Sequence, residues 1–252
     1  MTSSSLKYSK DNTDKKLDYN SLRQLKEEAY KNLKKRVLKD DAIGTNEDGT
    51  FYLKGDYYEK QLRIALRNCG IIDPGNIEDS IATDGYKALA DLLENNVSGQ
   101  QTVDDMTRAN LRGRGGAGFN AGRKWAEALS HEAPHKYIVC NADEGDPGAF
   151  MDRSILELDP HSVLEGMAIA GYAIGADKGF IYVRAEYPLA VRNLKIAINQ
   201  AMEKGLFEVK ETTITNPDGS VRVTKTTKVT GHGQVYFINM VLEEQKGALC
   251  PA

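Results

Sequence analysis

A glycine-rich stretch at residues 111–119, Leu-Arg-Gly-Arg-Gly-Gly-Ala-Gly-Phe, carries the residues best suited to binding a ligand. Four of the six positions from 113 to 118 are glycine. Without Cβ atoms the backbone can approach a flat or anionic ligand and direct several N–H groups at it. Arg123 and Lys124 follow at the start of a predicted helix, where their charge would favour a phosphate group.

This stretch differs from the usual dinucleotide fingerprint. That fingerprint comes directly after a strand and opens a helix, whereas residues 103–109 here predict a helix. A flexible linker or a tight structural turn is the alternative interpretation of the glycines.

A second candidate loop follows a predicted buried strand at residues 137–140 and runs through residues 141–150. Asn141 can both donate to and accept from the heteroatoms of a planar ring. Asp143, Glu144 and Asp146 can accept hydrogen bonds from sugar hydroxyls. A divalent metal suits these acids less well, because no histidines and cysteines gather nearby. Solvated acids in an Asx turn are the alternative.

The first part of the chain predicts helices with one small hairpin. Residues 1–19 are polar and predict a mobile tail. Residues 20–100 form a helical lead-in, with helices at 20–38 and 57–68, another opening at Asp73-Pro74, and a helical pattern through 86–93. Asp48-Gly49 predicts the turn of the hairpin. The first helix is amphipathic and would pack either on its own domain or on a partner subunit.

The middle of the chain, residues 101–206, alternates strands with helices. Strands are predicted at 137–140 and 180–183, and helices at 161–175 and 188–205. This alternation predicts an α/β domain with parallel strands. Residues 207–252 differ: a Thr/Val-rich segment at 209–230, turning at 216–219, predicts a C-terminal β-hairpin appendage, and residues 234–242 a further strand.

Composition excludes several classes of protein. The net charge of −3 does not favour a nucleic-acid binder, and no apolar stretch is long enough for a membrane span. The N-terminus has no apolar signal region. The three cysteines, Cys69, Cys140 and Cys250, are too few for a disulfide framework, so we expect a reducing, cytoplasmic location.

The two loops together closely resemble the FMN- and NADH-binding flavoprotein subunit of respiratory complex I and of NAD-linked hydrogenases and formate dehydrogenases. The shared motifs are Leu-Arg-Gly-Arg-Gly-Gly-Ala-Gly-Phe at 111–119 and Cys-Asn-Ala-Asp-Glu-Gly-Asp-Pro-Gly-Ala-Phe at 140–150. Similarity extends over residues 57–206 and includes Ile-Tyr-Val-Arg-Ala-Glu-Tyr at 181–187. The resemblance implies a glycine-rich-loop FMN/NADH-binding domain.

The resemblance also implies roles for single residues. Gly113, Gly115 and Gly116, with Arg114 between them, would let the flavin and NADH lie against the backbone. Lys124 would hold the FMN phosphate or a neighbouring polar group, and Phe119 would stack on NADH. Asn141, Asp143 and Glu144 would contact the flavin and its ribityl chain, with Asp146 beside the dinucleotide. Hydride would pass from NADH to FMN, and electrons onward to iron–sulfur partner subunits. That step needs no acid or base, so no catalytic side chain is predicted.

The sequence departs from the family at two places. The family loop usually continues Pro-Thr-Gly-Leu, where this chain has Asn120, Ala121 and Arg123, and Glu127 stands where an aromatic can help to stack the adenine. Beyond residue 206, the family's second wall of the flavin pocket and its four-cysteine [4Fe–4S] motif are not found. Two accounts fit: a fragment-like NADH:acceptor oxidoreductase subunit, or a catalytically silent paralogue that acts as a structural, partner-binding subunit.

Overall fold

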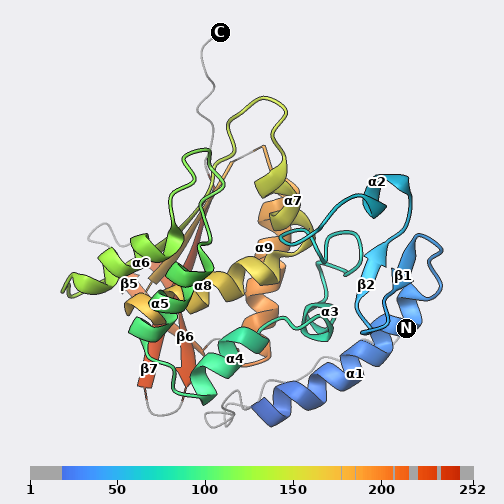
Figure 1. The fold of residues 1–252 in the computed structure, drawn as a ribbon. Coiled ribbons are helices and arrows are strands. Elements are labelled where there is room, and N and C mark those ends of the chain that lie inside the picture. Colours follow the sequence, from blue (N-terminus) through green and yellow to red (C-terminus); the bar gives the residue numbers. More distant parts are fainter. Residues whose placement is uncertain are drawn as a thin grey trace.

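The computed structural model describes residues 19–176, 178–184, 186–206, 208–215, 221–231 and 234–244. Residues 1–18 of the predicted tail, the turn at 216–219 and the C-terminal residues with Cys250 lie outside these residues, while Tyr19, also assigned to the tail, begins the first helix. Figure 1 shows the arrangement, in which the N-terminal helices flank an α/β body.

The lead-in begins with the predicted amphipathic helix, α1 (Tyr19–Val37). Leu22, Ala29, Leu33 and Val37 on its apolar face are buried, whereas Leu25 is exposed. The hairpin follows as β1 (Ile43–Thr45) and β2 (Phe51–Leu53), paired antiparallel. In its turn Gly49 has φ of 86°, and the Asp48 carboxylate accepts from the Thr50 N–H at 2.9 Å. Both elements agree with the sequence prediction.

The predicted helix at residues 57–68 is wrong, because only the single turn α2 (Asp56–Glu59) forms. A longer helix would have to bury one apolar face. Leu62 and Ile64 are instead 88% and 65% exposed, and the chain continues in turns. The helix predicted to open at Asp73-Pro74 begins later, as α3 (Ile77–Ala82), where the Asn76 side chain caps it by accepting from the Glu78 N–H. α4 (Lys87–Glu94) is a separate helix, because Tyr86 has φ of 65° and breaks the pattern.

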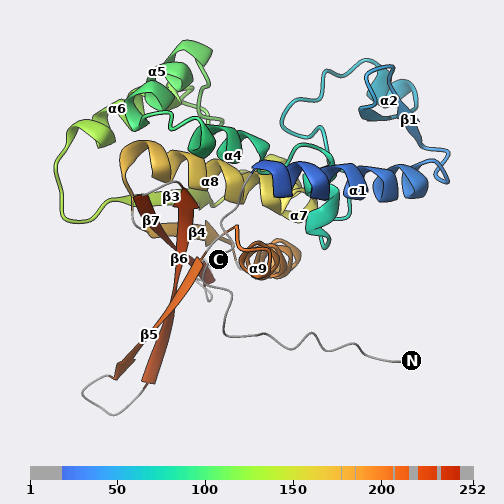
Figure 2. The same ribbon diagram turned by 90° about the horizontal axis from the view of Figure 1, so that it is seen from below.

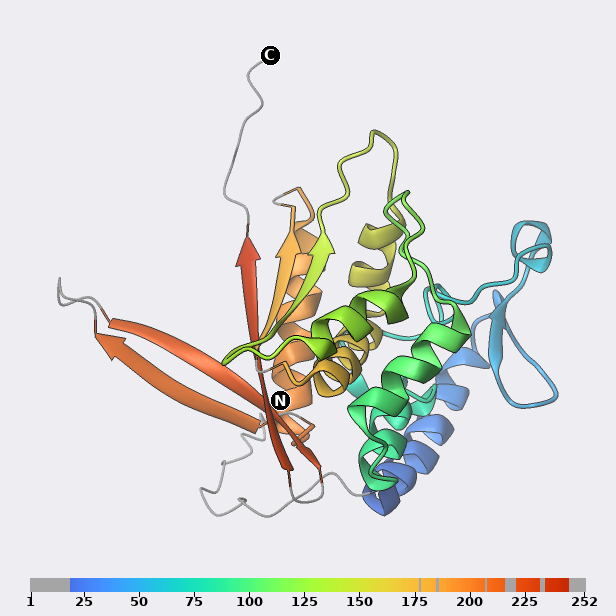
Figure 3. The ribbon, with the colours of Figure 1, turned by 60° about the vertical axis from the view of Figure 1, so that its left-hand side comes forward.

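The α/β part contains helices on both sides of the glycine-rich loop and a mixed sheet. Its elements are α5 (Gly99–Ala109), α6 (Ala121–Ser130), β3 (Tyr137–Ala142), α7 (Met151–Leu158), α8 (Pro160–Ile174), β4 (Lys178–Val183), α9 (Pro188–Glu203), β5 (Glu208–Thr215), β6 (Val221–Gly231) and β7 (Gln234–Glu244). The strand order is β3-β4-β7-β6-β5. β3, β4 and β7 run parallel, and β6 joins β7 and β5 antiparallel. The pair β5–β6 extends away from the helices (Figures 2 and 3).

One hydrophobic cluster joins the lead-in to the sheet. It contains Ile81 and Leu89 from the lead-in, Leu164 from α8, Ile181 from β4 and Leu194 from α9. Figure 2 shows α4 and α5 stacked over α8, with β3 and β4 on the opposite side of α8. The helices approach closely: a Cβ added at Gly99 would lie 2.4 Å from the carbonyl oxygen of Ala173. The two parts therefore share a core.

Candidate functional site

The glycine-rich loop is held at its base by its own backbone. Arg112 and Asn120 form an antiparallel bridge, and the Gly113 N–H donates to the Phe119 carbonyl at 2.8 Å. The Asn120 side chain then caps α6 by accepting from the Arg123 N–H at 3.0 Å. These hydrogen bonds fix both ends of the loop between α5 and α6. The helix predicted to follow the loop is α6.

Three of the four loop glycines, Gly115, Gly116 and Gly118, face open space, whereas a Cβ added at Gly113 would lie 3.7 Å from the Phe119 carbonyl oxygen. Gly116 and Gly118 have φ of 100° and 60°, which only glycine adopts at little cost. Gly115 has no positive φ, and a Cβ added there would have no protein atom within 4 Å. Neither backbone conformation nor packing within the described residues requires glycine at 115. A bare, open backbone at this position fits a flat ligand lying against it.

A small pocket adjoins the loop. Its volume is about 220 Å³, and it is lined by Asn110, Arg112, Ala117, Gly118, Phe119, Asn120 and Arg123. The Phe119 ring is 48% exposed, and the Lys124 Nζ lies 5.8 Å from the ring centroid. Arg114 is exposed on the loop and does not line the pocket. The aromatic ring of Phe119 thus lies beside the cationic side chains at this pocket.

The second loop begins where β3 ends, and its first two residues, Asn141 and Ala142, belong to that strand. The Asn141 side chain accepts from the Asp143 N–H at 3.0 Å, which is the Asx turn weighed as an alternative. Asn141, Asp143 and Asp146 are exposed. β3 and β4 end level with each other, Ala142 beside Val183, and Figures 1 and 3 show both loops at this same end of the molecule.

Glu144 differs from the other residues of the loop because it is buried, with 8% of the residue exposed. Its two carboxylate oxygens accept from the backbone N–H groups of Asp152 and Arg153, each at 3.2 Å. These groups lie in the first turn of α7, a helix that was not predicted from the sequence. Glu144 therefore anchors the loop to the N-terminus of α7. Its contact with the flavin stays a prediction.

Two residues that were not predicted for the site hold the same loop from the end of β4. The Arg184 guanidinium donates to the Glu144 carbonyl oxygen and lies 3.9 Å from the Asp143 carboxylate. The Tyr187 hydroxyl donates to the Glu144 carbonyl oxygen at 3.4 Å, and the guanidinium groups of Arg184 and Arg153 lie 5.7 and 5.5 Å from the centroid of its ring. The signal available in the sequence was a charged residue directly after a predicted strand.

The described cysteines are not poised for chemistry. Burial raises the pKa of Cys140 to about 11, with a smaller contribution from the negative charge of Asp152. Burial also raises the pKa of Cys69 to about 11. Both thiols stay protonated at neutral pH. Within the described ranges, no three His, Cys, Asp or Glu side chains gather as a metal site, and no helix is long and apolar enough to cross a membrane.

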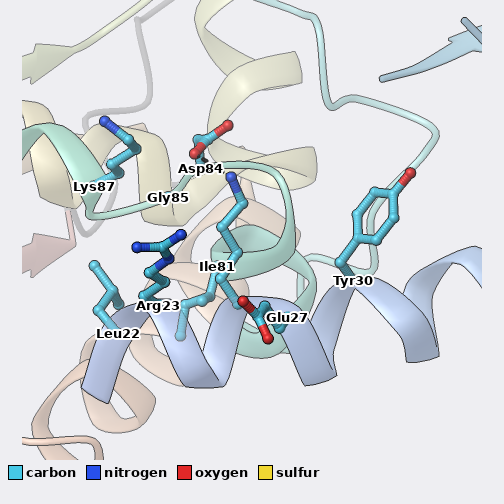
Figure 4. Close-up of a pocket in the computed structure, with 9 residues that line it drawn as sticks. Leu22, Arg23, Glu27, Tyr30, Ile81, Asp84, Gly85 and Lys87 are labelled. Carbon is cyan, nitrogen blue, oxygen red and sulfur yellow. Dashed lines mark hydrogen bonds and ion pairs between the residues drawn. The ribbon is translucent and has the colours of Figure 1, made fainter. Parts of the chain in front are cut away.

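A larger groove, of about 490 Å³, lies between α1 and the turn that precedes α4 (Figure 4). Opposite charges line it, and Lys26 pairs with Asp84 at 2.6 Å between two partly exposed side chains. Gly85 has a structural reason to be glycine, because a Cβ would lie 2.6 Å from the Ser80 carbonyl oxygen. The groove contains none of the predicted site residues.

Comparison with known proteins finds a family whose similarity to this chain includes both loops. A family model described as the Nuo51 FMN-binding domain matches residues 106–238. The NADP-reducing hydrogenase subunit HndC of Solidesulfovibrio fructosivorans is 60% identical over 149 residues, which are 59% of this chain and 30% of the relative. An NADH-quinone oxidoreductase subunit from Aquifex aeolicus is 42% identical over 60% of this chain and 35% of its own length.

A third relative is the NAD-reducing hydrogenase HoxS subunit alpha of Cupriavidus necator, 45% identical over 43% of this chain and 18% of its own length. The chain thus spans about a third or less of the length of these relatives. The family model covers more than half of the chain and includes both loops. The chain belongs to the Nuo51 FMN-binding domain family.

Proposed function

We propose that this chain binds FMN and a reduced nicotinamide dinucleotide at the open end of the sheet, as the flavoprotein module of an NADH:acceptor oxidoreductase. The observation that carries the proposal is Gly115, whose bare backbone faces open space without a conformational or packing reason. A ligand lying against the loop supplies that reason. The family match and the second loop at the same end of the sheet support the proposal.

The chain's own residues would bind and orient the two ligands. Gly113, Gly115 and Gly116 would let the rings lie against the backbone, with Arg114 beside them. Phe119, whose ring is exposed, would stack on the dinucleotide, and Lys124 would neutralise a phosphate. When bound, FMN would take up hydride from the nicotinamide. The protein's part in that step is to bring the two rings together.

At the second loop, Asn141 and Asp143 are exposed and would contact the flavin or its ribityl chain. Asp146 would lie beside the dinucleotide. Glu144 would act on the site through the loop, because its carboxylate is held by α7. The glycine loop and the exposed polar groups fit FMN, and the Glu144 carboxylate accepts from the backbone at the start of α7.

The electron acceptor would lie in a partner protein. The relatives are named as subunits of a hydrogenase and of a quinone oxidoreductase. Iron–sulfur partner subunits would then accept electrons from the flavin. The names of the relatives include both NADP and NADH, so they do not decide which dinucleotide this chain takes.

The test is an absorbance spectrum of the purified, folded chain with FMN, recorded without oxygen before and after a reduced dinucleotide is added. We expect a protein-bound flavin band that bleaches on addition. A chain that retains flavin but does not bleach would instead act as the catalytically silent, partner-binding subunit. A folded chain that takes up no flavin would contradict the proposal.

A further inference from the structure

The pocket beside the glycine loop is cationic. Arg112 and Arg123 are among its seven lining residues, and none of the seven is acidic. The surrounding sequence has the same bias, because residues 106–126 contain five Arg or Lys and no Asp or Glu. A pocket with this charge favours an anion of the size of a phosphate group.

Arg123 is available to such an anion. Its side chain is exposed, and the guanidinium has no hydrogen-bond or ion-pair partner among the described residues, Glu127 one turn further along α6 included. Its backbone N–H is already taken by Asn120, so the residue is fixed at the start of α6. Arg112 uses one donor, to the Gly118 carbonyl at 3.1 Å, and keeps the remainder of its five N–H groups.

The same pocket contains an aromatic ring. Phe119 lines it together with the two arginines, and its ring is 48% exposed. A flat ring beside two guanidinium groups matches an adenosine that carries an additional phosphate. Dinucleotide sites that take NAD usually place an acid against the ribose 2′-hydroxyl, whereas an arginine accommodates the 2′-phosphate of NADP. The lining of this pocket, with two arginines and no acid, resembles that of a site for NADP.

We propose that Arg123, assisted by Arg112, binds the 2′-phosphate of NADPH, and that the site prefers NADPH to NADH. The 2′-phosphate carries close to two negative charges at neutral pH and offers three acceptor oxygens to the guanidinium forks. This inference rests on the proposed function, because it assigns the dinucleotide of the same site. The phosphate of FMN and the pyrophosphate of the dinucleotide have related chemistry, and the experiment separates them.

The experiment measures equilibrium binding of 2′,5′-ADP and of 5′-AMP to the full chain. Isothermal titration calorimetry measures both affinities, because Trp125, the chain's single tryptophan, packs against the cluster that contains Val103 and Ala173 and does not line the pocket. We expect 2′,5′-ADP to bind about tenfold more tightly than 5′-AMP. Arg123→Leu should lower the affinity for 2′,5′-ADP by about tenfold and so remove this difference. Arg123→Lys should retain part of it, as a point charge without the planar fork.

Arg23→Leu is the matched control. Arg23 is an exposed arginine in the groove beside α1, away from the lining of this pocket, and the change should not alter either affinity. With flavin-loaded chain, NADPH should bleach the flavin at lower concentration than NADH, and Arg123→Leu should bring the two concentrations together.

Three results would overturn the inference. Equal affinity for 2′,5′-ADP and 5′-AMP in a chain that still binds FMN would refute it and leave the proposed function intact. An Arg123→Leu variant that weakens both nucleotides equally would assign the arginine to the 5′-phosphate side. An Arg123→Leu variant that still binds riboflavin but no longer binds FMN would assign the arginine to the flavin phosphate. A folded chain that binds neither FMN nor nucleotides would refute the proposed function itself.

Discussion

At the scale of single residues, the open glycine and the exposed ring carry the site. Gly115 and Gly122 differ in the reason for being glycine. A Cβ at 115 has no protein neighbour within 4 Å, whereas a Cβ at 122 would lie 2.3 Å from the Thr107 hydroxyl oxygen. Gly122 serves the packing of α6 on α5, and Gly115 is free to serve a ligand.

This difference gives a prediction. Gly115→Val should abolish or greatly weaken FMN binding, because the added side chain occupies the surface on which the ring would lie. The melting temperature of the FMN-free chain should stay within a few degrees of the unchanged chain. Gly122→Val should lower that temperature instead, because the valine collides with α5. An unchanged FMN dissociation constant in Gly115→Val would remove the loop from the site.

Phe119 gives a second prediction at this scale. Phe119→Ala should weaken dinucleotide binding by about five- to tenfold, because stacking of an aromatic ring on a base contributes about 1 kcal/mol. FMN affinity should change less. Phe119→Tyr keeps the ring and should keep the affinity, measured by titration of the dinucleotide. Equal loss in both variants would mean that shape around the side chain matters and stacking does not.

At the scale of elements, the helices and strands with continuous apolar patterns were predictable. α1, α8 and α9 have bounds close to those expected, because each buries a periodic apolar face, whereas α5 begins four residues before the predicted start at residue 103. The helix at residues 57–68 failed because its pattern has no surface to pack on, as exposed Leu62 shows. α7 was missed because Glu144, which accepts from the N–H groups of its first turn, lies eight residues before Asp152 and so outside the usual N-cap position.

At the site, too, some residues could be predicted from local sequence motifs, and others only from the contacts between elements. The glycine loop and the acids after β3 follow from sequence motifs, and the structure brings the two loops to one end of the sheet. The inward orientation of Glu144 and the contacts of Arg184 depend on where α7 and β4 lie. Such contacts between separate elements cannot be obtained from spacing along the chain.

Glu144 gives the prediction for this scale. Glu144→Gln should lower the free energy of unfolding by about 1–2 kcal/mol, because an amide replaces the charged acceptor of two N–H groups at the start of α7. Asp146→Asn is the control in the same loop, where the exposed side chain should contribute less than about 0.5 kcal/mol. Chemical denaturation measures both. No difference between the two variants would contradict the capping role.

At the scale of the whole molecule, a buried polar network joins the lead-in to the α/β part. The Tyr86 hydroxyl lies 2.8 Å from Nδ1 of His161, and Nε2 of His161 lies 3.2 Å from the Gln200 amide oxygen. Gln200 in turn donates to the Gly75 carbonyl at 2.6 Å. These contacts connect residues 75 and 86 to α8 and α9. The lead-in is thus attached through polar contacts as well as through the shared apolar core.

The network makes stability depend on pH. Burial lowers the pKa of His161 to about 4, while the Gln200 hydrogen bond opposes this to a smaller degree. An unfolded histidine has a pKa of about 6.5. Between these values the unfolded chain binds the proton and the folded chain does not. The stability linked to His161 is therefore complete above pH 6.5 and is lost as the pH falls toward 4.

The measurement is the free energy of unfolding from pH 7 to 4.5 for the unchanged chain and for His161→Gln. We expect the unchanged chain to lose up to roughly 1.4 kcal/mol per pH unit more than the variant within this window. Burial raises the pKa of the nearby carboxyl groups of Asp159 and Glu165, an effect of opposite sign that both proteins share. Parallel pH profiles would show that His161 is not the group that titrates.

Every functional proposal for this chain depends on FMN binding at the open end of the sheet. An equilibrium titration of FMN fluorescence with the folded chain, performed beside Gly115→Val, measures that binding. We expect saturable quenching with one FMN per chain, lost in the variant whose fold is unchanged. Absence of quenching by the folded chain, or equal quenching by the variant, would contradict the proposed site.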